Sequence, residues 1–168
     1  MKNYFFKTQV LALFVLVLWG CVKSEPIQTD VQKLETIAAG PLFEGVNTAT
    51  VEFDIQKLLP KEVKKEQLSE VRIKSIQLGL LDSAAPVPNS FTVLLASPNT
   101  SMKECGFIQE ESIKSNDYNV SLAKEQEFLE EILQDKMQTL VIDFDLKEDW
   151  FDDYTVTAVI DWELKFKN

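Results

Sequence analysis

A run of acidic and aromatic residues near the C-terminus, over residues 147–153, has the most unusual local composition in the chain. Together with Asp143 and Asp145 it gathers six carboxylates within eleven residues. Calcium takes six to eight oxygen ligands, and a turn rich in aspartate can supply them. The run has no D-x-[DN]-x-[DN]-G spacing and no glycine. A solvated acidic turn is therefore the expectation, with calcium as the alternative, and no residue is assigned as a metal ligand.

Two aromatic rings lie in the middle of this run, at Trp150 and Phe151. Aromatic rings at the tip of a β-domain can stack on a sugar ring or bury in a protein partner. They can also fold back and cap the end of the core. The sequence leaves both outcomes open, and it makes Asp149, Trp150, Phe151 and Asp152 a candidate binding loop.

The residue types needed for catalysis are largely missing. The chain has no histidine, which removes Ser-His-Asp and Cys-His machinery and imidazole-bound zinc. It also has no G-x-S-x-G motif and no phosphate-binding glycine loop. A glycosidase needs two carboxylates in one cleft, and among 27 acidic residues no spacing picks out such a pair. We therefore predict no enzymatic activity, no catalytic residues and no cofactor, with an acid-pair hydrolase as the enzyme alternative.

The N-terminus has the composition of an export signal. Lys2 and Lys7 precede an unbroken apolar run over residues 10–19, and Leu-Trp-Gly-Cys follows, ending at Cys21. The apolar run is too short to cross a bilayer as a stable helix but fits a signal peptide. These features together resemble a bacterial lipoprotein. The resemblance implies cleavage before Cys21 and a lipid on Cys21; the alternative is an ordinary secretory signal or short anchor in which Cys21 is incidental.

This resemblance divides the chain into a signal peptide over 1–20, a lipidated cysteine with a polar tether over 21–35, and a single domain over 36–168. Val22 is not the aspartate that often retains lipoproteins at the inner membrane, so the resemblance favours the outer membrane. The formal net charge is −10. Such a surface repels nucleic acid and anionic headgroups, so the expected partners are the membrane, through the lipid, and an envelope protein or glycan.

One cysteine remains if Cys21 carries lipid, because the chain has only two. Cys105 then has no partner for an intrachain disulfide. It has no CxxC pattern around it, so a buried and unreactive thiol is expected.

A second resemblance concerns modification. Asp82-Ser83-Ala84 resembles the short Asp-(Ser/Thr)-apolar motif at which exported Bacteroidetes proteins are O-glycosylated, and it lies in an expected loop. It makes Ser83 a candidate glycosylation site, with a chance match as the alternative. In general character, the length, strand pattern and lipobox look like the uncharacterised β-sandwich lipoproteins of Bacteroidetes, a resemblance that names no activity.

The last strand, expected over 154–167, organises the fold. Its apolar residues alternate with polar ones, as in a sheet with one buried face. Similar alternation predicts strands over 49–57, 71–81, 91–96, 118–122 and 139–146, with a shorter one around 106–108. The apolar parity changes at Lys74-Ser75, which predicts a β-bulge there.

One amphipathic helix is expected over 123–137, and the strand over 139–146 is expected to form an antiparallel hairpin with the last strand. These elements predict a mainly β protein: an antiparallel β-sandwich, immunoglobulin-like, with a small β-barrel as the alternative. The function expected from such a tethered domain is non-catalytic binding of a protein or polysaccharide. A purely structural role in the envelope is the other alternative.

Overall fold

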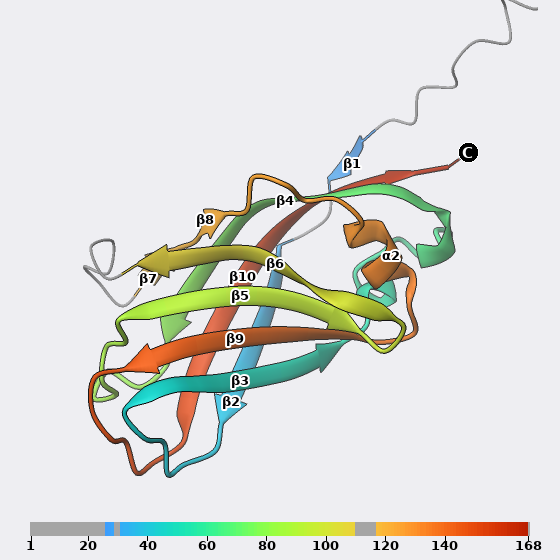
Figure 1. Ribbon diagram of the computed structural model, residues 1–168. Coiled ribbons are helices and arrows are strands. Elements are labelled where there is room, and N and C mark those ends of the chain that lie inside the picture. Colours follow the sequence, from blue (N-terminus) through green and yellow to red (C-terminus); the bar gives the residue numbers. More distant parts are fainter. Residues whose placement is uncertain (1–25, 29–30, 110–116, 168) are drawn as a thin grey trace, which may run out of the picture.

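The computed structural model describes residues 26–28, 31–109 and 117–167, which form one ten-stranded antiparallel sheet and a short helix (Figure 1). The elements in chain order are β1 Pro26–Gln28, β2 Gln32–Ala38, β3 Gly45–Phe53, the 3-10 turns η1 Ile55–Lys57 and η2 Lys65–Gln67, β4 Leu68–Leu80, β5 Ser90–Ser97, β6 Thr100–Gln109, β7 Asp117–Asn119, β8 Ser121–Leu122, α2 Leu129–Gln134, β9 Gln138–Leu146 and β10 Tyr154–Phe166. Within this part of the chain, no helix is long and apolar enough to cross a membrane.

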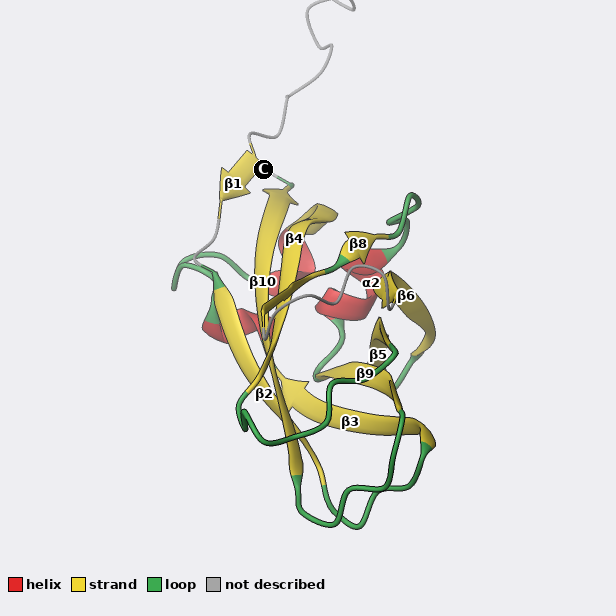
Figure 2. Cartoon of the chain, turned by 90° about the vertical axis from the view of Figure 1, so that its left-hand side faces the viewer, coloured by secondary structure: helices red, strands yellow, loops and turns green. Residues whose placement is uncertain are grey.

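The sheet folds over on itself into two facing layers, which Figure 2 shows from the side. The strand order is β7-β4-β10-β2-β3-β9-β5-β6-β8, and β1 pairs with β10 beside this path. The first four strands form one layer and the last five form the other. A single register pair, Ile37↔Thr50, joins the layers between β2 and β3. In an immunoglobulin domain the two sheets are separate, whereas here they share this edge.

At the opposite edge of the two layers, the chain passes directly from one layer to the other. β7 pairs with β4 and β8 pairs with β6, and only Val120 separates β7 from β8. The Val120 amide donates to the Ile76 carbonyl of β4 at 2.9 Å, and the Ala123 amide donates to the Cys105 carbonyl of β6 at 2.9 Å. The molecule is therefore a nearly closed, barrel-like sandwich. The predicted mainly β architecture, an antiparallel β-sandwich with one helix, is confirmed.

β10 is the central strand, as its sequence predicted. It pairs with β4 on one side and with β1 and β2 on the other. Its exposure alternates without interruption, and every residue on its inner face is buried: Tyr154, Val156, Ala158, Ile160, Trp162, Leu164 and Phe166. The inner faces of the two layers meet in ring contacts, of which Phe144 of β9 stacked on Tyr154 is the closest, with centroids 4.6 Å apart.

The predicted bulge is present in β4. Ser75 is opposite Asp161 and Ile73 is opposite Trp162, so Lys74 is the extra residue between two consecutive pairs. Ile73 and Ile76 are both buried on the same face despite their odd spacing. The bulge restores the buried face after the change of parity.

The predicted hairpin between the last two strands is wrong. β9 pairs with β3 and β5, whereas β10 pairs with β1, β2 and β4. The two strands lie in different layers and meet through their buried faces instead of their edges. The connection over 147–153 therefore crosses from one layer to the other at one end of the sandwich (Figure 1).

The predicted helix over 123–137 is largely wrong, since only Leu129–Gln134 is helical. Its buried residues, Leu129, Ile132 and Leu133, do belong to the predicted apolar stripe. Before them, the side-chain amide of Gln126 bonds to the backbone of Ile73 in β4, donating to O at 3.1 Å and accepting from N at 2.7 Å. These tertiary bonds hold the preceding segment along the sheet and shorten the helix.

The sheet includes residues that precede residue 36, the predicted start of the domain. β2 starts at Gln32, whose side chain accepts a hydrogen bond from the buried Trp162 indole at 3.1 Å. Residues 32–35 are thus part of the sheet rather than of the tether. The predicted signal peptide and Cys21 lie outside the described residues.

Candidate functional site

The candidate binding loop over 147–153 packs against a second loop that connects β2 to β3. Leu42 and Trp150 form an isolated antiparallel bridge, with N–H···O distances of 2.7 and 2.9 Å. The Asp149 carboxylate accepts from the Glu44 amide at 2.9 Å, and the Asp153 carboxylate accepts from the Gly40 amide at 3.1 Å. Four hydrogen bonds therefore hold the two loops together.

Gly40 is required by this close approach. A Cβ at Gly40 would lie 2.6 Å from the carbonyl oxygen of Asp152 and 2.8 Å from that of Phe151. Any side chain there would push the loops apart. The pair of loops is accordingly a defined structure and not two independent flexible turns.

The two rings of the candidate loop behave differently. Trp150 is half-buried and packs on the core, and its indole donates to the Asp153 carbonyl at 3.4 Å. Phe151 is 75% exposed. Trp150 thus caps the end of the core, whereas Phe151 points into solvent.

A second exposed ring, which was not predicted to be a binding residue, lies on the neighbouring loop. Phe43 is 63% exposed. Phe43 follows Leu42 and Phe151 follows Trp150, so each exposed ring is one residue from the bridge that joins the two loops. We call Phe43, Phe151 and the nearby Val46, which is 77% exposed, the aromatic tip.

The acids around the aromatic tip are dispersed. Asp143 accepts from the Thr48 hydroxyl at 2.6 Å and Asp145 accepts from the Asn89 amide at 3.0 Å, both on the sheet, while Asp149 and Asp153 bond to the neighbouring loop. Nowhere in the described ranges do three acidic or cysteine side chains gather in a way that could hold a metal ion. Asp152 is exposed in the loop itself.

The aromatic tip lies at the end of the sandwich away from β1. β1 pairs with residues 163–165 at the far end of β10, whereas the loop over 147–153 precedes the first residue of β10 (Figures 1 and 2). Thirteen residues of strand separate the two ends, a distance of about 40 Å.

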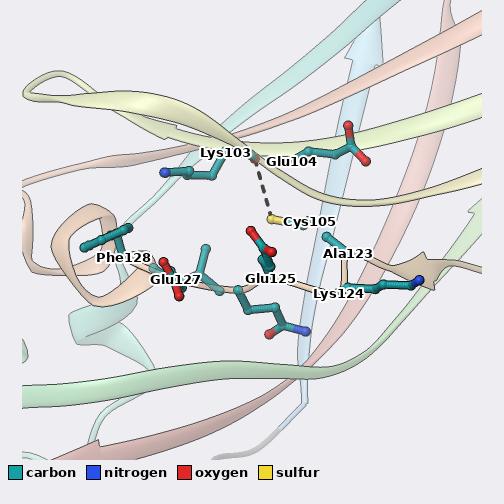
Figure 3. A pocket seen from close by; sticks show the side chains of 10 residues that line it. Lys103, Glu104, Cys105, Ala123, Lys124, Glu125, Glu127 and Phe128 are labelled. Atoms are coloured by element: carbon teal, nitrogen blue, oxygen red, sulfur yellow. Dashed lines mark hydrogen bonds between the residues drawn. The ribbon is translucent and has the colours of Figure 1, made fainter.

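Two adjoining hollows lie on another part of the surface, between β6 and the segment that leads into α2 (Figure 3). Their volumes are about 410 and 350 Å³. Phe128 and Lys103 line both. The spacing of apolar residues placed Phe128 within the predicted helix, so its exposure was not predicted. No pattern in the sequence indicated that the helix begins only at Leu129.

The remaining predicted residues lie apart from both regions. Ser83 is exposed in the β4–β5 loop, where the Asp82 carboxylate accepts from the Ala84 amide at 2.8 Å and fixes a turn. Cys105 is buried, as predicted, and burial raises the pKa of its thiol to about 12. A thiol with so high a pKa is a poor nucleophile.

Comparisons with known proteins leave the family of this chain open. No family model matches the sequence, and no curated protein matches it. One solved structure, from work on "the carbohydrate-binding modules from the beta-sandwich super family", aligns with 85% of this chain at 12% identity and a TM-score of 0.36. The aligned part spans 58% of that chain. A likeness of this strength carries no argument about the ligand.

Proposed function

We propose that this protein is a lipid-anchored, non-catalytic binding module of the bacterial envelope that contacts a protein partner through the aromatic tip. The observation that carries the proposal is the exposure of Phe43 and Phe151 on loops that hydrogen bonds hold in place. Exposed rings on a preorganised support lose little conformational freedom when they bind, which favours affinity.

The charges around the rings indicate the partner's chemistry. The two loops, over 40–46 and 147–153, contain five acidic residues and one lysine. Such a surface complements a partner with lysine or arginine residues around an apolar pocket. It disfavours anionic polysaccharide and anionic lipid headgroups.

The expected lipid on Cys21 fits this orientation. Cys21 precedes β1 by a few residues, and β1 pairs with the end of β10 opposite the aromatic tip. A lipid at Cys21 would hold that end near the membrane, so the tip would face away from the bilayer. By the resemblance to lipoproteins, the membrane is the outer membrane.

The test is cross-linking of the lipidated protein in intact cells of its native host, followed by measurement of binding to the identified partner. We expect one dominant protein adduct with wild type. The double variant Phe43→Ser/Phe151→Ser should weaken binding at least tenfold, and Asp152→Lys should weaken it at low salt. Met102→Ser is the matched control, because Met102 is 52% exposed on β6.

The proposal that the aromatic tip is the contact surface would be refuted if the double variant bound the partner as tightly as wild type does. Unfolding of the double variant would also refute it, because the two rings would then be structural. A glycan adduct in place of a protein would change the partner class. If wild type yields no adduct, the passive structural role is favoured. The anchor is tested separately: Cys21→Ser should abolish metabolic labelling with palmitate and release the protein from membranes.

A further inference from the structure

Phe128 has a backbone conformation that its residue type disfavours. Its φ and ψ are 67° and 18°, and it is the one non-glycine residue in the described ranges with a positive φ. A residue with a Cβ is strained in this left-handed region. Burial of the ring does not compensate, because Phe128 is 47% exposed.

The surrounding structure holds this strain in place. On the N-terminal side, Gln126 is fixed to β4 through its two bonds to Ile73. On the C-terminal side, Leu129 is 2% exposed and begins α2. The turn between two anchored residues places the Phe128 ring on the surface. Strain that the fold maintains without gain in packing is characteristic of binding sites.

The ring lies between the two hollows. Phe128 and Lys103 are the residues that both hollows share, and the Lys103 ammonium lies 5.1 Å from the ring centroid. Figure 3 shows Lys103 and Phe128 toward one end of the larger hollow, with Glu127 just below Phe128 and Glu125 nearer to Cys105. The two side chains form a ridge that a ligand spanning both hollows would cross.

The lining selects the class of ligand. Lys103 already occupies the position over the ring where a cationic ligand would bind, so it opposes cations. Carboxylates of both hollows oppose anions, while a second ammonium group, that of Lys124, lines the larger hollow, so neither hollow has a charge of one sign. The carboxylates are those of Glu104, Glu125 and Glu127 in the larger hollow and Glu131 in the smaller one. The smaller hollow also offers the polar residues Asn99, Thr100 and Ser101.

A neutral ligand rich in hydroxyl groups satisfies these conditions. Carboxylates accept hydrogen bonds from its hydroxyl groups and the lysine ammonium groups donate to them. The face of the Phe128 ring that Lys103 does not cover can pack on the apolar face of a sugar. We propose that the Phe128 ridge binds a neutral glycan, with sugar units in the hollows on both sides of the ring. This site is separate from the aromatic tip and does not depend on the function proposed for it.

The test separates a binding role from a structural one. Phe128→Gly removes the ring and tolerates a positive φ, and Phe128→Asn does so to a lesser degree. The purified full-length protein is titrated with soluble neutral β-glucan, mannan and xylan, and with alginate and chitosan as charged probes. Wild type should bind at least one neutral glycan saturably, and both variants should weaken that binding at least tenfold. Their unfolding midpoints should equal or exceed that of wild type.

Four outcomes would overturn the proposal: no saturable binding of any neutral glycan by wild type, binding of charged probes alone, unchanged binding by both variants, or a lower unfolding midpoint for both. Phe151→Ala is the matched control, since it removes an exposed ring from the other site. It should leave glycan binding unchanged.

Discussion

Gln138, the first residue of β9, has a buried polar side chain and provides the sharpest test of how the fold is held together. It is fully buried. Its carbonyl oxygen accepts from the Ile55 amide at 2.9 Å, and its amide nitrogen donates to the Asp135 carbonyl at 2.7 Å. Longer bonds of 3.3 and 3.4 Å reach the carbonyls of Leu133 and Ile132 in α2. One side chain therefore joins η1, α2 and β9.

Gln138→Leu keeps the size of the side chain and removes these bonds. The Ile55 amide then stays buried without this partner, at a cost of about 1–3 kcal/mol. Loss of the short bond to Asp135 costs about 1 kcal/mol more, since that carbonyl also accepts from the Lys65 ammonium at 2.6 Å. The free energy of unfolding should fall by about 2–4 kcal/mol, and the melting temperature by roughly 4–16 °C.

Equilibrium unfolding in urea, followed by tryptophan fluorescence, measures this change. Gln134→Leu is the matched control, because Gln134 is half-exposed in α2 and makes one bond, to the Leu68 carbonyl at 2.8 Å. It should cost about 1 kcal/mol. If Gln138→Leu changes stability by less than 1 kcal/mol, or no more than Gln134→Leu does, the role assigned to Gln138 is refuted.

Four further predictions concern other parts of the sheet. Gly106→Ala should destabilise the fold by about 1–3 kcal/mol in thermal unfolding, because the new Cβ would lie 2.6 Å from a backbone oxygen of β8. An unchanged melting temperature would contradict this prediction. In a Cys21→Ser background, Cys105 should resist iodoacetamide at pH 8 until urea unfolds the protein, and full native labelling would disprove its burial. Because its pKa rises from 9.0 to about 12 on folding, the free energy of unfolding should be constant below pH 9 and fall between pH 9 and 12. A chain that begins at Thr36 should have a free energy of unfolding in urea about 2 kcal/mol lower than a chain that begins at residue 26. The shorter chain lacks Gln32, the buried hydrogen bond of its side chain and several cross-strand pairs. Equal stability of the two chains would support the predicted boundary at residue 36.

The strands were predictable because their pattern depends on local geometry. Side chains alternate along any extended strand, so the inner face of β10 follows from its sequence alone. The bulge at Lys74 was predictable for the same reason, since a change of parity must be corrected within the strand. The exposure of Phe151 was one of two outcomes that the sequence left open for the candidate loop.

The helix and the hairpin were mispredicted because their outcome depended on contacts with distant residues. A 3.6-residue period favours a helix over 123–137, yet the bonds from Gln126 to β4 prevent its first turns. The same contacts place Phe128 on the surface, so the ridge was not visible in the pattern. Phe43 was missed because no local pattern shows which distant loop lies beside it.

The amino-acid sequence by itself determined most of the long strands and the face that each of them buries, although β2 was not predicted and only part of β6 was. It also determined that histidine-dependent chemistry is absent. The tertiary structure alone decided which strands pair, where the helix begins, and which aromatic rings remain in solvent. The physical reason is that backbone N–H and C=O groups are the same in nearly every residue. The side-chain pattern therefore specifies the face that a strand buries, but not the neighbour to which its edge bonds.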